Sequence, residues 1–141
     1  MHDIRLACAD ADIASTFRLM VQLRTHLSET EFVPLIQKMK RESGYRLVAL
    51  RTDEAIGAVA GFRITDSLAW GHYIYVDDLI TDDRMRSRGY GEALLDWIAE
   101  YGKAQGCTQL HLDSGVQRHG AHRFYLRERM DITCYHFRRE L

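Results

Sequence analysis

Cysteine, proline and long hydrophobic runs are scarce in this sequence, and each scarcity excludes a class of protein. The three cysteines, Cys8, Cys107 and Cys134, are far apart and form no Cys-x-x-Cys pair. This spacing argues against a disulfide framework or a zinc site and suits reduced thiols, so we expect a cytoplasmic protein. Pro34 is the only proline, and no low-complexity linker interrupts the chain. We therefore expect one domain that spans residues 1–141.

The charges of the chain are almost balanced. There are 19 Lys and Arg residues against 20 Asp and Glu residues. Such a weak overall field gives no reason to expect binding to nucleic acid or to an acidic membrane. No apolar stretch approaches the ~18 residues that a membrane span needs. The first residues also lack the basic and then apolar pattern of an export signal, so neither export nor a membrane span is expected.

Hydrophobic periodicity predicts alternating strands and helices. A strand over residues 3–8 precedes helices over about 11–27 and 30–42, and Gly44 ends the second helix. YRLVALR and IGAVAGFRI form a hairpin, and the run AWGHYIYVDDLIT is a long third strand. The second half adds an amphipathic helix, the strand TQLHLDS, the short helix RHGAHRFYLRERM and a closing strand, DITCYHFRREL. This order predicts the α/β (α+β) class, with a mixed, mostly antiparallel sheet flanked by helices.

A short basic and glycine-rich segment, RMRSRGYG, joins the long strand to the amphipathic helix. It lacks the GxxxxGK[ST] pattern of a P-loop and the third glycine of a dinucleotide fingerprint. Its pattern is Arg86-x-x-Gly89-x-Gly91. Glycines allow positive φ, and the first turn of a helix has main-chain N–H groups without partners, so the junction is suited to an anion such as a pyrophosphate.

These residues resemble the acetyl-coenzyme A loop of the GCN5-related N-acetyltransferases, whose pattern is Gln/Arg-x-x-Gly-x-Gly/Ala. The resemblance extends in order over nearly the whole chain and includes a second motif, AxxFY, here Ala121 to Tyr125. The closing segment also looks like the corresponding part of aminoalkylphosphonate acetyltransferases, a branch of that family. Two positions depart from the pattern: Arg118 stands where Asn is frequent, and Arg129 where Gly is usual. The first puts any contact of that Asn in doubt, and the second costs about 1 kcal/mol if Arg129 takes positive φ.

The resemblance implies the acyl-coenzyme A N-acyltransferase fold, with acetyl-coenzyme A as co-substrate. The pyrophosphate would lie on Arg86, Ser87, Arg88, Gly89, Tyr90 and Gly91. The long strand would bulge around Asp78, so that the main chain of Leu79, Ile80 and Thr81 pairs with the pantetheine arm as another strand would. A main-chain N–H near Leu79 would then face the thioester oxygen.

The same resemblance implies the catalytic groups. Tyr125 resembles the general acid that protonates the thiolate leaving group, and a core tyrosine with a satisfied hydroxyl is the alternative. Asp77 and Asp78 stand where the family often has a carboxylate, and we favour Asp78 as the base because it directly precedes Leu79. An ordinary aspartate is a weak base for an ammonium group, so a water relay or selection of the neutral amine is equally open. In the other interpretation, the acidic pair only attracts or orients a cationic substrate.

Candidate contacts to the acceptor are assigned by position alone. Glu31 and Phe32 lie on the second predicted helix, and Asp77 and Tyr75 lie on the long strand. Tyr73 shares a strand face with Tyr75, and the two could floor an acceptor pocket, although cross-strand aromatic packing is the alternative.

A metal site is a further hypothesis, because His111, His119 and His122 accompany Asp113. Their spacing does not support it well, and no dedicated metal is expected.

The function predicted from the sequence is direct transfer of an acetyl group from acetyl-coenzyme A to a primary amine of a small molecule, in a ternary complex. The alternatives are a protein or peptide amine as acceptor, a coenzyme A sensor without turnover, and a protein that binds another diphosphate. The segment ITCYHFRREL could pair across a two-fold axis, so a homodimer is expected.

Overall fold

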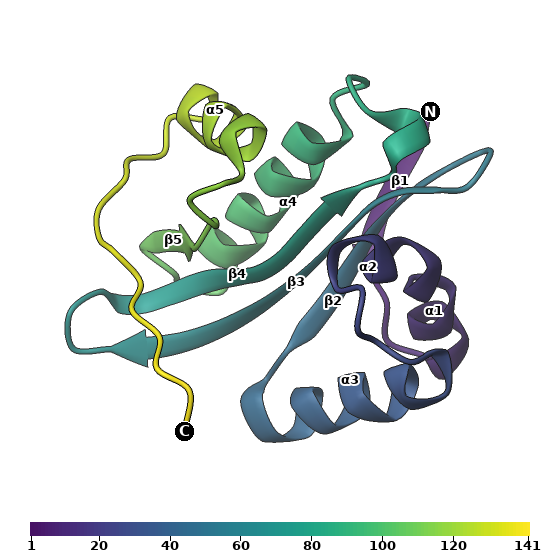
Figure 1. The fold of residues 1–141 in the computed structure, drawn as a ribbon, viewed down its shortest axis with the longest axis horizontal. Helices are drawn as coiled ribbons and strands as arrows, with labels where there is room; N and C mark the ends of the chain where they lie inside the picture. The colour runs from purple at the N-terminus through teal and green to yellow at the C-terminus, as the bar shows by residue number, and fades with distance from the viewer. The chain divides into compact units, whose positions relative to one another are not determined.

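The computed structural model describes residues 1–141, which divide into two compact units, Met1–His111 and Leu112–Leu141. Five strands form one sheet in the order β1-β2-β3-β4-β5 (Figure 1). The strands are β1 (His2–Leu6), β2 (Arg46–Thr52), β3 (Ile56–Ser67), β4 (Gly71–Thr81) and β5 (Gln109–Leu112). The helices are α1 (Asp10–Ser15), α2 (Phe17–Leu23), α3 (Glu29–Ser43), the 3-10 helix η1 (Asp83–Met85), α4 (Tyr90–Ala104) and α5 (His119–Arg127). The predicted class, a mixed and mostly antiparallel sheet flanked by helices, is confirmed.

The ladder between β3 and β4 contains a β-bulge. Gly61 pairs with Asp78, but the next residue, Phe62, pairs with Val76, so Asp77 is an extra residue in β4. Because side chains alternate between the faces of a strand, one extra residue changes which residues share a face. Tyr75, which precedes the bulge, and Asp78, which follows it, pair with residues of the same face of β3.

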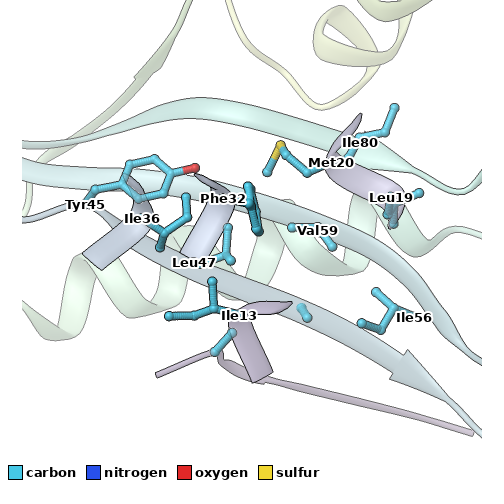
Figure 2. Close-up of a cluster of buried hydrophobic side chains, with 12 residues drawn as sticks. Ile13, Leu19, Met20, Phe32, Ile36, Tyr45, Leu47, Ile56, Val59 and Ile80 are labelled. Atoms are coloured by element: carbon cyan, nitrogen blue, oxygen red, sulfur yellow. The ribbon is translucent and has the colours of Figure 1, made fainter. Parts of the chain in front are cut away.

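Helices cover both faces of the sheet. On one face, α1, α2 and α3 pack on a buried cluster around Ile13, Phe32, Leu47 and Val59, with Tyr45 at one end (Figure 2). On the other face, α4 contributes buried leucine and isoleucine side chains, and Tyr101 packs edge-on against Phe62. Each fully buried aliphatic or aromatic side chain stabilises the fold by about 1.5–3 kcal/mol. The sheet is therefore a rigid base for the segments at its ends.

The prediction of one continuous helix over residues 11–27 is wrong. This segment forms two helices, α1 and α2, which meet at the buried Thr16. The Thr16 hydroxyl donates to the main-chain oxygen of Ile13 at 2.7 Å. Such a bond from a side chain to the preceding turn competes with the helical ladder and favours a bend. The helix predicted over residues 30–42 is confirmed as α3, and Gly44 ends it with a φ of 69°.

The second unit contains α5, and the strand predicted for DITCYHFRREL is wrong. Residues 131–141 have no regular secondary structure and all are exposed, including Ile132, Tyr135 and Phe137. A strand needs a neighbouring strand to satisfy its main-chain groups, and an alternating pattern does not supply that neighbour. The predicted two-fold pairing through this segment therefore stays a prediction. None of the helices is both long enough and apolar enough to cross a membrane.

Arg129 provides a test of backbone strain at the end of α5. Its φ is 62°, in the left-handed region that favours glycine, and the N–H of Met130 donates to the oxygen of Tyr125 at 3.1 Å. Because glycine adopts this φ without steric cost, Arg129→Gly is expected to raise the free energy of unfolding by about 1 kcal/mol. Arg127→Gly, inside the helix, is the matched control and should lower it by about 1 kcal/mol. Chemical denaturation measures both, and a destabilised Arg129→Gly would contradict the strain.

Candidate active site

The loop between β4 and α4 presents main-chain donors to the solvent. Ser87 has a φ of 65° and Gly89 a φ of 77°, both in the left-handed region. Gly89 is the N-cap of α4, and no side chain caps the helix. The N–H groups of the first turn, beginning at Tyr90, therefore have no partner within the helix. Together with the helix dipole, they form a concave site for an anion.

The side chains of this loop divide into exposed and packed ones. Arg86 and Arg88 are exposed, and Arg86 forms an ion pair of 2.6 Å with Asp83. Tyr90 is packed instead, because a Cβ atom on Gly57 would lie only 2.7 Å from its ring. The Tyr90 side chain is therefore partly buried against β3. An open cavity of about 200 Å³ adjoins the loop, lined by Glu54, Ala55, Arg84, Met85 and Arg88.

Asp82, which the sequence analysis missed, anchors the loop. Its side chain is 1% exposed and accepts hydrogen bonds from the main-chain N–H of Arg84 at 3.0 Å and from the Arg18 guanidinium at 2.9 Å. The Arg84 guanidinium adds an ion pair of 3.1 Å. The hydrogen bonds from Arg84, followed by that from Arg18, hold the pKa of Asp82 far below its ordinary value, although burial acts in the opposite direction. The available signal was an aspartate directly after a strand, in a position where its side chain can accept a hydrogen bond from the main-chain N–H two residues later.

The second half of β4 has an open edge. β5 has four residues against eleven in β4, and the N–H of Thr108, just before β5, donates to the oxygen of His72 at 2.9 Å. β5 therefore begins level with the start of β4, and Asp77 to Thr81 extend beyond it. The N–H of Asp82 donates to Gly57 of β3 at 2.9 Å. Because main-chain groups alternate sides along a strand, those of Leu79 and Thr81 point away from β3, and those of Ile80 point toward it.

The two aspartates of the bulge are both held by arginines. The Arg63 guanidinium binds both oxygens of Asp77, each at 2.8 Å. Asp78 accepts a hydrogen bond of 2.8 Å from Arg24 Nε and one of 2.7 Å from the Tyr45 hydroxyl. Two carboxylates and two guanidinium groups thus meet at one place on the sheet. Pairs separated so far along the chain carry no local sequence signal, so Arg24, Arg63 and Tyr45 were also missed.

Aromatic side chains continue this face of the sheet. The Trp70 ring stacks on His111 at 3.9 Å between centroids, and Tyr73 packs edge-on against both. The Arg63 guanidinium carbon lies 5.3 Å from the centre of the Tyr75 ring. Packing between strands therefore accounts for much of the Tyr73 environment, while Tyr75 lies beside the charged residues of the bulge.

The two predicted acceptor residues of α3 have different environments. Glu31 is exposed. Phe32 is 2% exposed and packs edge-on against Phe17, with ring centroids 5.3 Å apart. Its side chain belongs to the hydrophobic core, since every third or fourth residue of an amphipathic helix faces inward. We therefore assign Phe32 to the core and retain Glu31 as a candidate.

Tyr125 lies on α5, in the second unit, where it packs edge-on against Phe124. Burial raises the pKa of the Tyr125 phenol, and the positive charge of Arg118 acts in the opposite direction. A phenol with a raised pKa stays protonated near neutral pH and can donate a proton. In the same unit, His122 hydrogen-bonds the main-chain oxygen of Gly115 at 2.7 Å. No three His, Cys, Asp or Glu side chains are grouped to hold a metal ion.

Comparisons with known proteins show which family and fold the chain resembles. The Acetyltransferase (GNAT) family profile matches residues 13–130. The chain is 34% identical over 128 residues to the Bacillus subtilis protein named Uncharacterized N-acetyltransferase YhdJ, and the match covers 89% of each chain. It is 32% identical over 98 residues to the aminoalkylphosphonate N-acetyltransferase of Salmonella typhimurium, covering 69% of this chain and 62% of that one. A solved structure, of a transcriptional regulator from Bacillus halodurans, has the same fold, with a TM-score of 0.87 over 100% of both chains and 19% identity.

The anchoring role of Asp82 predicts an acid-dependent stability. Asp82→Asn is expected to lower the free energy of unfolding by about 1–2 kcal/mol at pH 7, allowing for the half-exposed arginines. Because folding lowers the pKa of Asp82, its contribution is complete above the unfolded value of ~4 and is lost as pH falls below it. Denaturation at pH 7 and pH 3 should therefore show a smaller gap between wild type and variant at pH 3. An equal gap at both would contradict the assignment, and the exposed Asp83→Asn is the control.

Proposed function

Because the chain belongs to the Acetyltransferase (GNAT) family, we propose that it transfers the acetyl group of acetyl-coenzyme A directly to a primary amine of a small molecule. The chain is an acetyl-coenzyme A-dependent N-acetyltransferase, and residues 1–141 act as one catalytic domain in this proposal. The observation that carries it is the uncapped N-terminus of α4 behind Gly89, next to the open edge of β4. An anionic and extended co-substrate needs both features.

The pyrophosphate of the co-substrate binds the loop in this proposal. The main-chain N–H groups after Gly89 donate to phosphate oxygens, and the positive end of the helix dipole favours the negative charge. Ser87 and Gly91 complete the main-chain lining. Arg86 and Arg88 are exposed beside these donors and supply charge-assisted hydrogen bonds.

The pantetheine arm then extends along β4. Its amides pair with the main chain of Leu79 and Thr81, which points away from β3, and Ile80 keeps its bonds within the sheet. The N–H of Leu79 donates to the thioester oxygen. When the amine attacks the thioester carbon, negative charge develops on that oxygen, and a donor fixed in a rigid strand stabilises it without reorganisation.

The acceptor amine lies at the bulge in this proposal, where Asp78 and Asp77 provide negative charge. Asp78 accepts a hydrogen bond from the amine, and water carries the amine proton away. Glu31 and Tyr75 border the acceptor. The neighbouring Arg24 and Arg63 side chains are 44% and 36% exposed, so their guanidinium groups suit an acceptor that also carries an acidic group. The relative named as an aminoalkylphosphonate N-acetyltransferase supports such an acceptor.

Tyr125 is the general acid of the proposed reaction. Collapse of the tetrahedral intermediate forms the amide and breaks the carbon–sulfur bond, and the departing thiolate takes the phenolic proton. Tyr125 belongs to the AxxFY motif, and its raised pKa keeps it protonated beforehand. The exposed or partly exposed cysteines are given no covalent role, because direct transfer requires no acetyl-enzyme.

Gly89→Asp tests the binding loop. The position has open space around a Cβ atom, so the added carboxylate acts through charge and through its φ of 77°. Isothermal titration with acetyl-coenzyme A should show micromolar binding to the wild type and at least about tenfold weaker binding to the variant. Gly71→Asp, with a φ of 70° and equally open space, is the matched control for strain and should bind as the wild type does. Equal binding by Gly89→Asp and the wild type would exclude this loop.

Tyr125→Phe tests the general acid. Removing a proton donor used only in the reaction should lower kcat by about 10²-fold and leave the Kd of acetyl-coenzyme A unchanged. The measurement is release of the coenzyme A thiol in a screen of small amines, with and without acidic groups. Tyr135→Phe, an exposed tyrosine of the same unit, is the control. Unchanged kcat in Tyr125→Phe would return Tyr125 to a structural role.

A further inference from the structure

The buried hydroxyl of Tyr45 needs a hydrogen-bond partner, and its partner is a carboxylate of the candidate site. The Tyr45 side chain is 2% exposed at one end of the hydrophobic cluster (Figure 2), and its hydroxyl donates to Asp78 Oδ2 at 2.7 Å. We propose that Tyr45 is a positioning residue for acetyl transfer, because it fixes the carboxylate of Asp78 toward the acceptor amine. This inference rests on the proposed function, in which Asp78 contacts the amine.

Gly61 makes the contact between Tyr45 and Asp78 possible. It pairs with Asp78 across the β3–β4 ladder, next to the bulge. A Cβ atom at Gly61 would overlap the ring and the hydroxyl of Tyr45. The Tyr45 side chain therefore crosses β3 where a side chain is missing, and it reaches β4 through that space. This requirement is one of close approach, not of backbone conformation.

Arg24 holds the other oxygen of the carboxylate. Its Nε donates to Asp78 Oδ1 at 2.8 Å, and its Nη2 donates to the main-chain oxygen of Asp77 at 2.9 Å. The two oxygens of Asp78 are thus held by donors from two different segments of the chain, so the carboxylate cannot rotate without losing one of these hydrogen bonds. A carboxylate oxygen can accept two hydrogen bonds, and each oxygen of Asp78 accepts one from these donors, which leaves capacity for the amine.

The two aspartates differ in how they are held. Asp77 is held by a single bidentate guanidinium, and its side chain is 25% exposed. The Asp78 side chain is 14% exposed and accepts hydrogen bonds from the buried Tyr45 hydroxyl and from the more exposed Arg24. Burial, and then the negative charge of Asp78, raise the pKa of Tyr45, so its hydroxyl remains a donor over the working pH range. The buried hydroxyl is therefore a permanent restraint on Asp78.

Tyr45→Phe removes this restraint and keeps the ring in the core. In steady-state kinetics with an amine that the wild type acetylates, kcat/KM for the amine should fall at least tenfold. KM for acetyl-coenzyme A and the melting temperature should change little, which separates positioning from a structural effect. Tyr101→Phe, on the opposite face against Phe62, is the control and should retain full activity. Gly61→Ala, which keeps the hydroxyl but displaces the ring, should reproduce the loss.

The outcomes separate the two proposals. An active wild type whose Tyr45→Phe variant keeps its kcat/KM for the amine overturns the positioning role and leaves the proposed function intact. A wild type that acetylates no amine overturns both. A parallel fall in activity and melting temperature in Tyr45→Phe assigns the hydroxyl to stability and also overturns the positioning role. If Gly61→Ala fails to fold, Tyr45→Phe decides alone.

Discussion

The extra residue at Asp77 is the constraint on which the rest of the site depends. Without it, Tyr75 and Asp78 would point to opposite faces of β4, because their positions differ by an odd number. With it, both pair with residues of one face of β3, the face that also carries Arg63 and Gly61. One inserted residue therefore gathers charged, aromatic and core-anchored side chains on one surface.

Electrostatic pairing holds both ends of the segment that follows the bulge. Asp78 at its start is paired with Arg24, and Asp82 at its end is paired with Arg18 and Arg84. Arg18 and Arg24 are on or directly after α2, so one short helix reaches both ends of the segment that carries Leu79. Because α2 also packs in the core, hydrophobic contacts fix its position. The ion pairs of Arg18 and Arg24 therefore hold β4 in a fixed position relative to this helix.

Local patterns in the sequence predicted most of the fold. The hairpin, the long strand, α3 with its Gly44 cap and the helix after Gly89 follow from periodicity and glycine, which act over a few residues. The division at Thr16 was missed because a hydroxyl bonding to the preceding turn leaves no trace in the hydrophobic pattern. The closing strand was wrong because alternation specifies a face but no partner. The loop resemblance located Gly89, whereas Asp78 and Arg24, 54 positions apart, could be paired only in three dimensions.

The open edge of β4 has a consequence for the stability of the apoprotein. A strand edge without a neighbour leaves its amide hydrogens accessible to exchange and its main chain available for unwanted pairing. In the proposed binding mode, acetyl-coenzyme A occupies this edge as a temporary strand. Because the ligand binds only the folded protein, the free energy of unfolding then rises with the concentration of acetyl-coenzyme A. A ligand at one hundred times its Kd raises it by about 2.7 kcal/mol. In this binding mode, acetyl-coenzyme A would thus stabilise the folded protein as well as serve as its co-substrate.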